Sequence, residues 1–319
     1  MLSNKHILLT GGAGFIGSHL ANALLELGNK VTVIDNFDPF YSKEIKLKNI
    51  QSLVQNTNFK FQEMDIREMD QLQTHCNESY DMIVHLAAKA GVRPSIENPL
   101  EYQSVNVAGT QNLLEFAKIK KINHFVFASS SSVYGVNPHV PWKESDYVLN
   151  PISPYASTKI SGELLGHVYS HLYNIRFVAL RFFTVFGPRQ RPDLAIHLFT
   201  KKIMNGEPIN MFGDGSTRRD YTYVDDIVSG IIGACTYDEK MFEVFNLGNS
   251  QTVTLNEMIS TIENTLSKKA IIHQMPEQPG DVPITFSDIT KAKEKLNFNP
   301  QTSLKEGVEK FVEWLNKNK

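Results

Sequence analysis

The chain has 319 residues, of which 41% are hydrophobic and 21% are charged, and its formal net charge at pH 7 is −2. This mixture is typical of a globular protein, and a chain of this length favours two lobes over a single hydrophobic core. The nearly balanced charge excludes a general electrostatic attraction to nucleic acid or to an anionic membrane surface, so an anionic ligand has to be held by local cations.

Short runs of apolar and β-branched residues recur along the first part of the chain. They are typical of buried parallel strands and cover residues 6–10, 31–35, 59–65, 82–88, 124–130 and 177–183. Helical patterns lie between them, at residues 18–28, 107–121 and 155–173. This alternation predicts an α/β fold, a Rossmann-type doubly wound parallel sheet with helices on both faces.

After residue 183 the alternation weakens. Loops rich in Pro, Gly and Arg, such as "FGPRQRPD" and "FGDGSTRRD", separate isolated helices and short strands. We therefore predict a dinucleotide-binding Rossmann domain over residues 1–183 and a smaller α/β C-terminal substrate lobe over residues 184–319. The helical pattern of residues 221–235 indicates that part of residues 221–250 returns to the larger domain.

The cofactor of that domain is predicted from its first turn. The stretch "LLTGGAGFIGSHL" places Gly11, Gly14 and Gly17 directly after a strand and at the start of a helix. Glycines at this spacing allow a tight turn, a close approach of the backbone to a pyrophosphate and close packing of the helix, whose N-terminus attracts phosphate. Asp35 ends the second strand, where a carboxylate binds the adenosine ribose and repels the additional phosphate of NADP, so NAD is favoured. The end of the third strand offers adenine contacts from Asp65 and Ile66.

A tyrosine and a lysine lie four residues apart in "SPYASTKISGE". Tyr155 and Lys159 would share one face of a helix, where the ammonium favours the phenolate and brings the pKa of the tyrosine toward neutrality. This spacing is common by chance, but "FVFASSSSVYG" at residues 125–135 adds several hydroxyls after the fifth strand. Since an open α/β sheet binds ligands at the carboxyl ends of its strands, the three features together predict an active site.

Taken together, these motifs resemble the extended short-chain dehydrogenases/reductases, and specifically the nucleotide-sugar epimerases. The resemblance runs over essentially the whole chain, through "TGGAGFIGSHL", "HLAA", "NVAGTQNLLE", "SSSSVYG", "YASTK", "LRFFTVFGP", "RRDYTYVDDI" and "PGDVP". It implies that Tyr155 is the base, that Lys159 holds the nicotinamide ribose and lowers the pKa of the tyrosine, and that Ser130 bridges a substrate hydroxyl and the phenol. It further implies cofactor contacts from Phe15, Ile16, Asn36, Leu86, Ala87, Ala88, Lys89 and Asn106.

The resemblance also favours one reaction. Relatives that eliminate water or decarboxylate carry an acidic residue just before the VYG tripeptide, where this chain has Ser131 and Ser132. An epimerase that oxidises, rotates and re-reduces its sugar is therefore favoured over a dehydratase or decarboxylase. The stretches at residues 36–50 and 87–99, like those at 182–196 and 278–283, look most like UDP-glucuronate 4-epimerases. A UDP-glucose or UDP-N-acetylglucosamine 4-epimerase, a net NAD-dependent oxidoreductase and a non-catalytic NAD sensor are the alternatives.

The same resemblance implies how a UDP-sugar is held. Arg93, Arg191 and Arg219 lie in the matching loops, and arginine–phosphate pairing is strong and directional, so we expect them to bind the diphosphate. Thr184 stands where UDP-galactose 4-epimerases usually have Asn, and Gln278 where they usually have Arg. The hydroxyls of Thr184 and of Ser130, Ser131 and Ser132 would hold a C6 carboxylate. Long helices near residues 100–119 and 155–173 would pair with those of a second copy, which predicts a homodimer.

The cysteines and the N-terminus bear on location. Cys76 and Cys235 are the only cysteines, and neither belongs to a CxxC pattern or to a metal-ligand spacing, which fits a reducing compartment and predicts no metal. The stretch "MLSNKHILLT" lacks the signature of a signal peptide, and no apolar run is long enough to span a bilayer. We therefore expect a cytoplasmic protein without a membrane partner.

Overall fold

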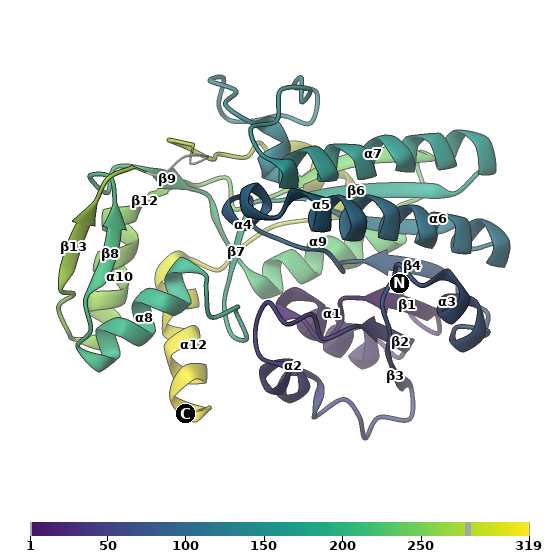
Figure 1. Ribbon diagram of the computed structural model, residues 1–319, viewed down its shortest axis with the longest axis horizontal. Coiled ribbons are helices and arrows are strands. Elements are labelled where there is room, and N and C mark those ends of the chain that lie inside the picture. The colour runs from purple at the N-terminus through teal and green to yellow at the C-terminus, as the bar shows by residue number, and fades with distance from the viewer. Residues whose placement is uncertain (1, 278–281, 319) are drawn as a thin grey trace.

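The structure is a computed structural model that describes residues 2–277 and 282–318. Over these residues, no helix is both long enough and apolar enough to cross a membrane. Gln278 and most of the "QPGDVP" stretch lie outside the described residues. A large layered α/β unit makes up most of the molecule, and a smaller group of helices and strands lies at one end of it (Figure 1).

The large unit is built on one parallel sheet, to which the described residues contribute seven strands. The order β11–β6–β5–β4–β1–β2–β3 is that of a doubly wound dinucleotide-binding sheet with one further strand at its edge. This confirms the Rossmann-type sheet predicted from the sequence. The strands are β1 (His6–Thr10), β2 (Lys30–Asp35), β3 (Phe59–Glu63), β4 (Met82–His85), β5 (His124–Ser130), β6 (Arg176–Phe182) and β11 (Phe242–Leu247).

Helices cover both faces of this sheet (Figure 1). On one face lie α6 (Gly109–Lys120) and α7 (Pro154–Tyr173), and on the other lie α1 (Phe15–Glu26) and α9 (Val224–Thr236). The shorter helices of this unit are α2 (Lys43–Ile50), α3 (Met69–His75), α4 (Val92–Glu97), α5 (Pro99–Tyr102), the π-helix η1 (Gln103–Ala108) and the 3-10 helix η2 (Ser131–Tyr134).

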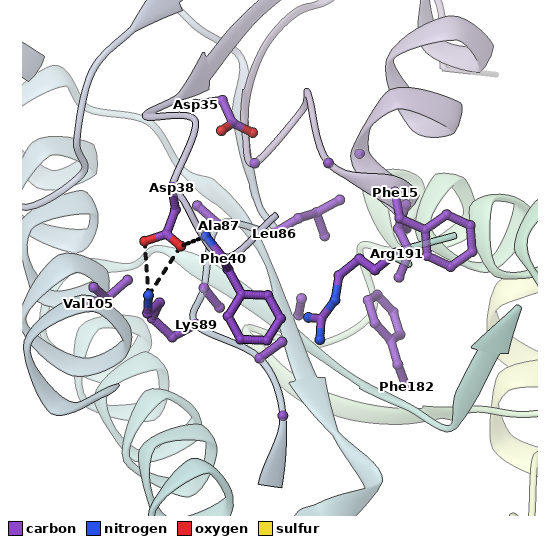
Figure 2. Close-up of a pocket in the computed structure, with 18 of the residues that line it drawn as sticks. Phe15, Asp35, Asp38, Phe40, Leu86, Ala87, Lys89, Val105, Phe182 and Arg191 are labelled. Carbon is purple, nitrogen blue, oxygen red and sulfur yellow. Dashed lines mark hydrogen bonds and ion pairs between the residues drawn. The ribbon is translucent and has the colours of Figure 1, made fainter. Parts of the chain in front are cut away.

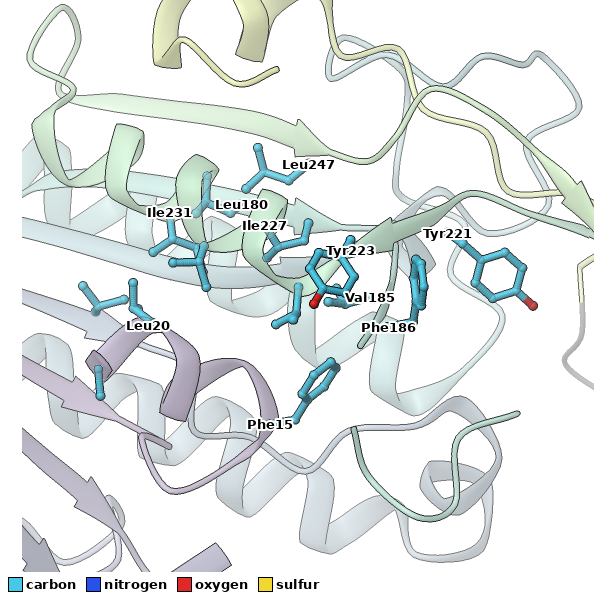
Figure 3. Packing of buried hydrophobic residues seen from close by; sticks show 14 of the residues in the cluster. Phe15, Leu20, Leu180, Val185, Phe186, Tyr221, Tyr223, Ile227, Ile231 and Leu247 are labelled. Atoms are coloured by element: carbon cyan, nitrogen blue, oxygen red, sulfur yellow. The ribbon is translucent and has the colours of Figure 1, made fainter. Parts of the chain in front are cut away.

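A hydrophobic cluster fills the space between the sheet, α9 and α1. Figure 3 shows Ile227 and Ile231 of α9 beside Leu180 of β6 and Leu247 of β11, with Leu20 of α1 below them. All five side chains are fully buried. Because each buried aliphatic side chain contributes about 1.5–3 kcal/mol, this packing ties α9 to the sheet firmly.

The smaller group of elements appears on the left in Figure 1. The parallel strands β8 (Ile209–Phe212) and β13 (Ile272–Met275) lie beside α8 (Ala195–Asn205) and α10 (Leu255–Leu266), and α10 packs against α12 (Leu304–Lys317). The antiparallel pair β9 (Arg218–Arg219) and β12 (Val253–Thr254) and the parallel pair β7 (Thr184–Phe186) and β10 (Tyr221–Tyr223) connect this group to the sheet. Helix α11 (Thr290–Leu296) contacts α9 and β11.

The chain leaves the large sheet after β6 and comes back to it with β11. Phe242 of β11 pairs with Phe177 of β6, and the register continues to Leu247 opposite Phe182. Both α9 and β11 lie within residues 221–250, the segment expected to return to the larger domain. Where the boundary between the two domains falls stays a prediction.

Candidate active site

A cavity of about 400 Å³ lies at the carboxyl ends of the sheet strands, the edge where a doubly wound sheet binds its ligand (Figure 2). Residues that directly follow β1, β2, β4 and β6 all contribute to its wall. Of the residues predicted for the site, those that line it are Gly11, Gly14, Phe15, Ile16, Gly17, Asp35, Asn36, Asp65, Ile66, Leu86, Ala87, Ala88, Lys89, Ser130, Tyr155, Lys159, Thr184 and Arg191. One cavity therefore joins the predicted dinucleotide site to the predicted catalytic residues.

The turn after β1 is too tight for side chains. Gly11 has a φ of +72°, and a Cβ there would lie 2.7 Å from the backbone nitrogen of Ala87. A Cβ on Gly17 would lie 2.2 Å from the carbonyl oxygen of Gly11. Helix α1 begins after Gly14, and no side chain caps it, so its first N–H groups face the cavity and can bind phosphate oxygens.

The carboxylate of Asp35 is fixed at the end of β2. Its Oδ2 accepts a hydrogen bond from the backbone N–H of Ala13 at 3.2 Å, and its Oδ1 accepts one from that of Phe37 at 2.9 Å. Burial raises the pKa of Asp35, while the nearby charge of Lys46 and these two hydrogen bonds act in the opposite direction. Asn36 donates to Asp65 at 2.8 Å, which links the ends of β2 and β3 at the side of the cavity predicted for the adenosine.

Lys89 is held by two acidic side chains. Its Nζ lies 3.0 Å from a carboxylate oxygen of Asp38 and 3.0 Å from one of Glu101, as Figure 2 shows for Asp38. Asn106 does not line the cavity, but it lies directly behind Lys89. Its Oδ1 accepts from the backbone N–H of Lys89 at 2.8 Å, and its Nδ2 donates to the Lys89 carbonyl at 2.9 Å and to Thr158 at 3.0 Å. Asn106 thus fixes the backbone of the cavity wall.

Sequence reasoning missed part of the wall. The loop between β2 and α2 contributes Asp38, Phe40 and Tyr41 to the cavity, and α2 contributes Lys46. Lys46 donates to the carbonyl of Asp38 at 2.7 Å and lies 4.6 Å from the centre of the Tyr41 ring. The available signal was the stretch "NFDPFYSKEIK", whose aromatic and charged residues follow directly after the ribose-binding acid.

The predicted catalytic helix is well defined at its start. Ser153 caps α7 by accepting from the N–H of Ala156 at 3.1 Å, and Pro154 occupies the first turn, so the helix begins just before Tyr155. Lys159 is almost completely buried, and its Nζ donates to the carbonyl of Ala128 on β5 at 2.7 Å. The Nζ atom also lies 5.7 Å from the centre of the Tyr155 ring.

The pKa values of this pair follow from burial. Burial raises the pKa of Tyr155, opposed by a hydrogen bond with Ser130 and by the charge of Arg191. Burial lowers the pKa of Lys159 to about 7, opposed by the charge of Glu163. Within the chain, burial of the phenol is thus opposed by Ser130 and Arg191, while Lys159 donates to a strand carbonyl. That Lys159 lowers the pKa of Tyr155 when the cofactor is bound stays a prediction.

The serines divide into two groups. Ser130 lies in the cavity wall and also accepts from the backbone N–H of Ser132 at 3.2 Å, which starts η2. The hydroxyl of Ser132 donates to that of Ser130 at 3.0 Å. Ser131 and Ser132, both in η2, are not part of the cavity wall, whereas Thr184 is part of it.

One of the three predicted arginines reaches the cavity. Arg191 pairs with Asp193 at 2.7 Å, and its guanidinium lies over the ring of Phe40 at 4.7 Å. Arg93 lies over the ring of Phe212 at 5.2 Å, and Arg219 donates to the carbonyl of Arg218. Neither Arg93 nor Arg219 lines this cavity. Among residues 2–277 and 282–318, no three His, Cys, Asp or Glu side chains gather as a metal site would require.

The fold and the site together define an extended short-chain dehydrogenase/reductase. The sheet is doubly wound, a glycine turn opens α1, and a buried acid ends β2. Around the same cavity lie Ser130, Tyr155 and Lys159.

Comparison with known proteins gives the family. The chain belongs to the family described as GDP-mannose 4,6 dehydratase, whose model matches residues 8–311. It is 40% identical to the UDP-glucuronate 4-epimerase of Thermodesulfobacterium geofontis over 317 residues, which cover 98% of this chain and 97% of that protein. The family predicted from the motifs is thus confirmed.

Two solved structures are also similar over nearly the full length. The UDP-glucuronic acid 4-epimerase of Bacillus cereus, in complex with UDP-glucuronic acid and NAD, is 38% identical with a TM-score of 0.91, covering 98% of this chain and 100% of that one. The UDP-glucose 4-epimerase of Thermotoga maritima, with UDP-glucose, is 34% identical with a TM-score of 0.90, covering 98% of this chain and 99% of that one.

Proposed function

We propose that the protein is an NAD-dependent epimerase that inverts C4 of a UDP-sugar and converts UDP-glucuronate to UDP-galacturonate. The observation that carries the proposal is the single cavity in which Asp35 and the glycine turn at one end meet Ser130, Tyr155 and Thr184 at the other. A dinucleotide and a sugar bound there would lie with their reactive ends together. Relatives with this activity by name support the choice of reaction.

NAD fits the residues of the cavity. The uncapped N-terminus of α1 supplies N–H groups for the pyrophosphate, and the fixed carboxylate of Asp35 accepts hydrogen bonds from the ribose while repelling a 2′-phosphate. When bound, NAD supplies a reversible acceptor for the hydrogen of C4. Lys159 would hold the nicotinamide ribose, as the family resemblance implies.

Residues of the chain transfer the proton of the sugar 4-hydroxyl. Tyr155, as phenolate, accepts the proton of the sugar 4-hydroxyl while C4 is oxidised to a ketone, and Ser130 orients that oxygen by hydrogen bonding. The ketone then turns so that its other face meets the cofactor, and Tyr155 returns the proton as C4 is reduced. No net oxidation results. The alternative function, a net NAD-dependent oxidoreductase, would instead release reduced cofactor that accumulates during turnover.

The C6 carboxylate would be held by the hydroxyls of Ser130 and Thr184, the two of the four predicted residues that line the cavity. Firm binding matters, because a 4-keto uronic acid is a β-keto acid and can lose CO₂. The absence of an acidic residue at Ser131 and Ser132 supports epimerisation over dehydration or decarboxylation. The diphosphate would be bound by Arg191, with Arg93 and Arg219 as further candidates.

The test is to give the purified protein UDP-glucuronate, UDP-glucose and UDP-N-acetylglucosamine separately, and to identify the products by NMR. We expect UDP-galacturonate from the first, little UDP-pentose, and poor conversion of the other two. Absorbance at 340 nm should show no accumulation of reduced cofactor. Efficient conversion of UDP-glucose with UDP-glucuronate inert would favour the alternative that the Thermotoga enzyme suggests.

We further propose a homodimer in the cytoplasm. Leu164, Val168 and Leu172 follow one another at intervals of four residues on α7 and are each at least 45% exposed. Leu164 and Val168 line an apolar groove that also includes Val107 of η1 and Leu165. A second copy would bury this stripe in a bundle of α6 and α7 helices. Light scattering at micromolar concentration tests the dimer, and a monomer would contradict it.

The two buried free cysteines support a reducing compartment.

A further inference from the structure

One buried ion pair next to the cavity has no part in the function proposed so far. Glu163 on α7 and Arg181 on β6 have side chains that are 7% and 4% exposed. Arg181 donates from Nε to Oε1 at 3.0 Å and from Nη2 to Oε2 at 2.8 Å, a two-pronged contact. Burying two charges costs about as much as their attraction returns, so such a pair is a weak source of stability and invites a functional explanation.

The position of Glu163 connects it to the catalytic residues. It lies four residues after Lys159, so the two side chains are neighbours on one face of α7. Ser129 donates to Oε1 of Glu163 at 2.5 Å, and Ser129 directly precedes Ser130. The carbonyl of Ala128 accepts from Lys159. The carboxylate is thus fixed against the same short segment of β5 that holds Lys159 and carries Ser130.

The charges around Lys159 give this position a consequence. Burial lowers the pKa of Lys159 to about 7, and Glu163 is the charged group that opposes the decrease. The other titratable groups that face Lys159 are Tyr155, from the same helix, and His85 of β4, whose pKa burial lowers to about 3 so that it is neutral. Arg181 approaches from β6, beyond Glu163, and partly offsets the carboxylate.

We propose that Glu163 is a positioning residue of the active site: its carboxylate, fixed by the two-pronged contact with Arg181, keeps Lys159 protonated beside Tyr155. The proposal rests on the proposed function in that Lys159 and Tyr155 carry the chemistry there. The charge relation between Glu163 and Lys159 belongs to the protein itself and exists with or without a sugar.

The test measures the protonation of Lys159 directly. Protein with lysine labelled at 13Cε is titrated by NMR with NAD bound and no sugar, and the resonance of Lys159 is assigned by its loss in Lys159→Met. In Glu163→Gln the midpoint should fall by about one pH unit or more, because the opposite charge one turn along α7 from Lys159 has been removed. In Glu163→Gln/Arg181→Met it should fall by less, since the competing cation is removed as well. Ser129→Ala, which loses one hydrogen bond of the same network but no charge, should leave the midpoint in place.

The kinetic counterpart is the alkaline limb of kcat/KM for UDP-glucuronate, which should move to lower pH in Glu163→Gln and stay in place in Ser129→Ala. Equal midpoints in wild type, Glu163→Gln and the double variant would overturn the proposal, as would a shift in Ser129→Ala as large as that in Glu163→Gln. If Glu163→Gln fails to fold, the double variant, which leaves no unpaired buried charge, carries the same test. Wild-type protein that turns over no UDP-sugar would refute the proposed function and leave the NMR result to decide this one.

Discussion

Replacing Gly17 with alanine should separate cofactor binding from stability. A Cβ at this position would lie 2.2 Å from the carbonyl oxygen of Gly11 and 2.7 Å from the Cα of Gly12, both backbone atoms of the phosphate-binding turn. Ordinary contact begins near 3.4 Å, so the turn would have to move by about 1 Å. Alanine returns about 1 kcal/mol through its helix propensity, and overpacking of this kind costs about 3 kcal/mol, so the net loss is about 2 kcal/mol.

Gly28, at the other end of α1, provides the matched control. It has a φ of +78° and no atom within 4 Å of an added Cβ, so alanine there costs only the strain of the left-handed conformation, about 1–2 kcal/mol. The two variants should therefore lose similar stability, with a decrease in Tm of roughly 2–3 °C in each, measured by differential scanning calorimetry.

NAD binding should distinguish them. In Gly17→Ala the displaced turn no longer fits the pyrophosphate, and we expect the Kd for NAD, measured by isothermal titration calorimetry, to rise at least about tenfold, equivalent to 1.4 kcal/mol. In Gly28→Ala it should not change. If Gly17→Ala bound NAD as tightly as Gly28→Ala, the close contact between α1 and the turn would not be what shapes the phosphate site.

Three further predictions concern the catalytic and buried residues. Tyr155→Phe should lower kcat by about two to four orders of magnitude and leave the Kd for NAD unchanged, and near-normal turnover would remove Tyr155 from the mechanism. Thr184→Val should cost about 1.5–3 kcal/mol in kcat/KM for UDP-glucuronate, the value of a hydrogen bond to a charged group, and much less for UDP-glucose; equal losses would place the carboxylate elsewhere. Burial lowers the pKa of His85 to about 3, so the unfolded state binds more protons below pH 6.5 and stability falls as the pH falls toward 3. Urea unfolding should show that the free energy of unfolding decreases between pH 7 and pH 5 by about 2 kcal/mol less in His85→Gln than in wild type. Equal decreases in the two proteins would contradict a neutral His85 in the folded state.

The sheet could be predicted from the sequence because its strands are buried on both faces. Such strands are continuous apolar runs, and the expected residues 124–130 and 177–183 correspond to β5 (His124–Ser130) and β6 (Arg176–Phe182). The last strand, β11, was expected only as part of the segment at residues 221–250 that returns to the larger domain. The local sequence gives no pattern that marks it as the edge strand of a sheet that the chain left after β6.

The parts of the site that escaped prediction depend on contacts between distant residues. Helix α6 was expected from residue 107, but residues 103–108 form the π-helix η1, in which Asn106 bonds to the backbone of Lys89. The spacing of apolar residues does not indicate a π-helix, because it carries no information about the contact between Asn106 and Lys89. Similarly, Asp38 and Lys46 are ordinary charged residues in the sequence, and only the fold brings them to the cavity wall.

The position of β11 has a consequence for how the protein is made. On the ribosome, β6 emerges well before the strand that will cover it, because residues 183–241 have to be synthesised in between. At translation rates of about 5–20 residues per second, the apolar edge "RFVALRF" stays uncovered for on the order of ten seconds. An unpaired apolar strand edge is where chains join one another, so the nascent protein passes through an aggregation-prone interval that ends only when residues 242–247 arrive. Stalled synthesis within residues 183–241 would therefore yield a fragment that contains most strands of the dinucleotide-binding sheet and leaves the edge of β6 unpaired.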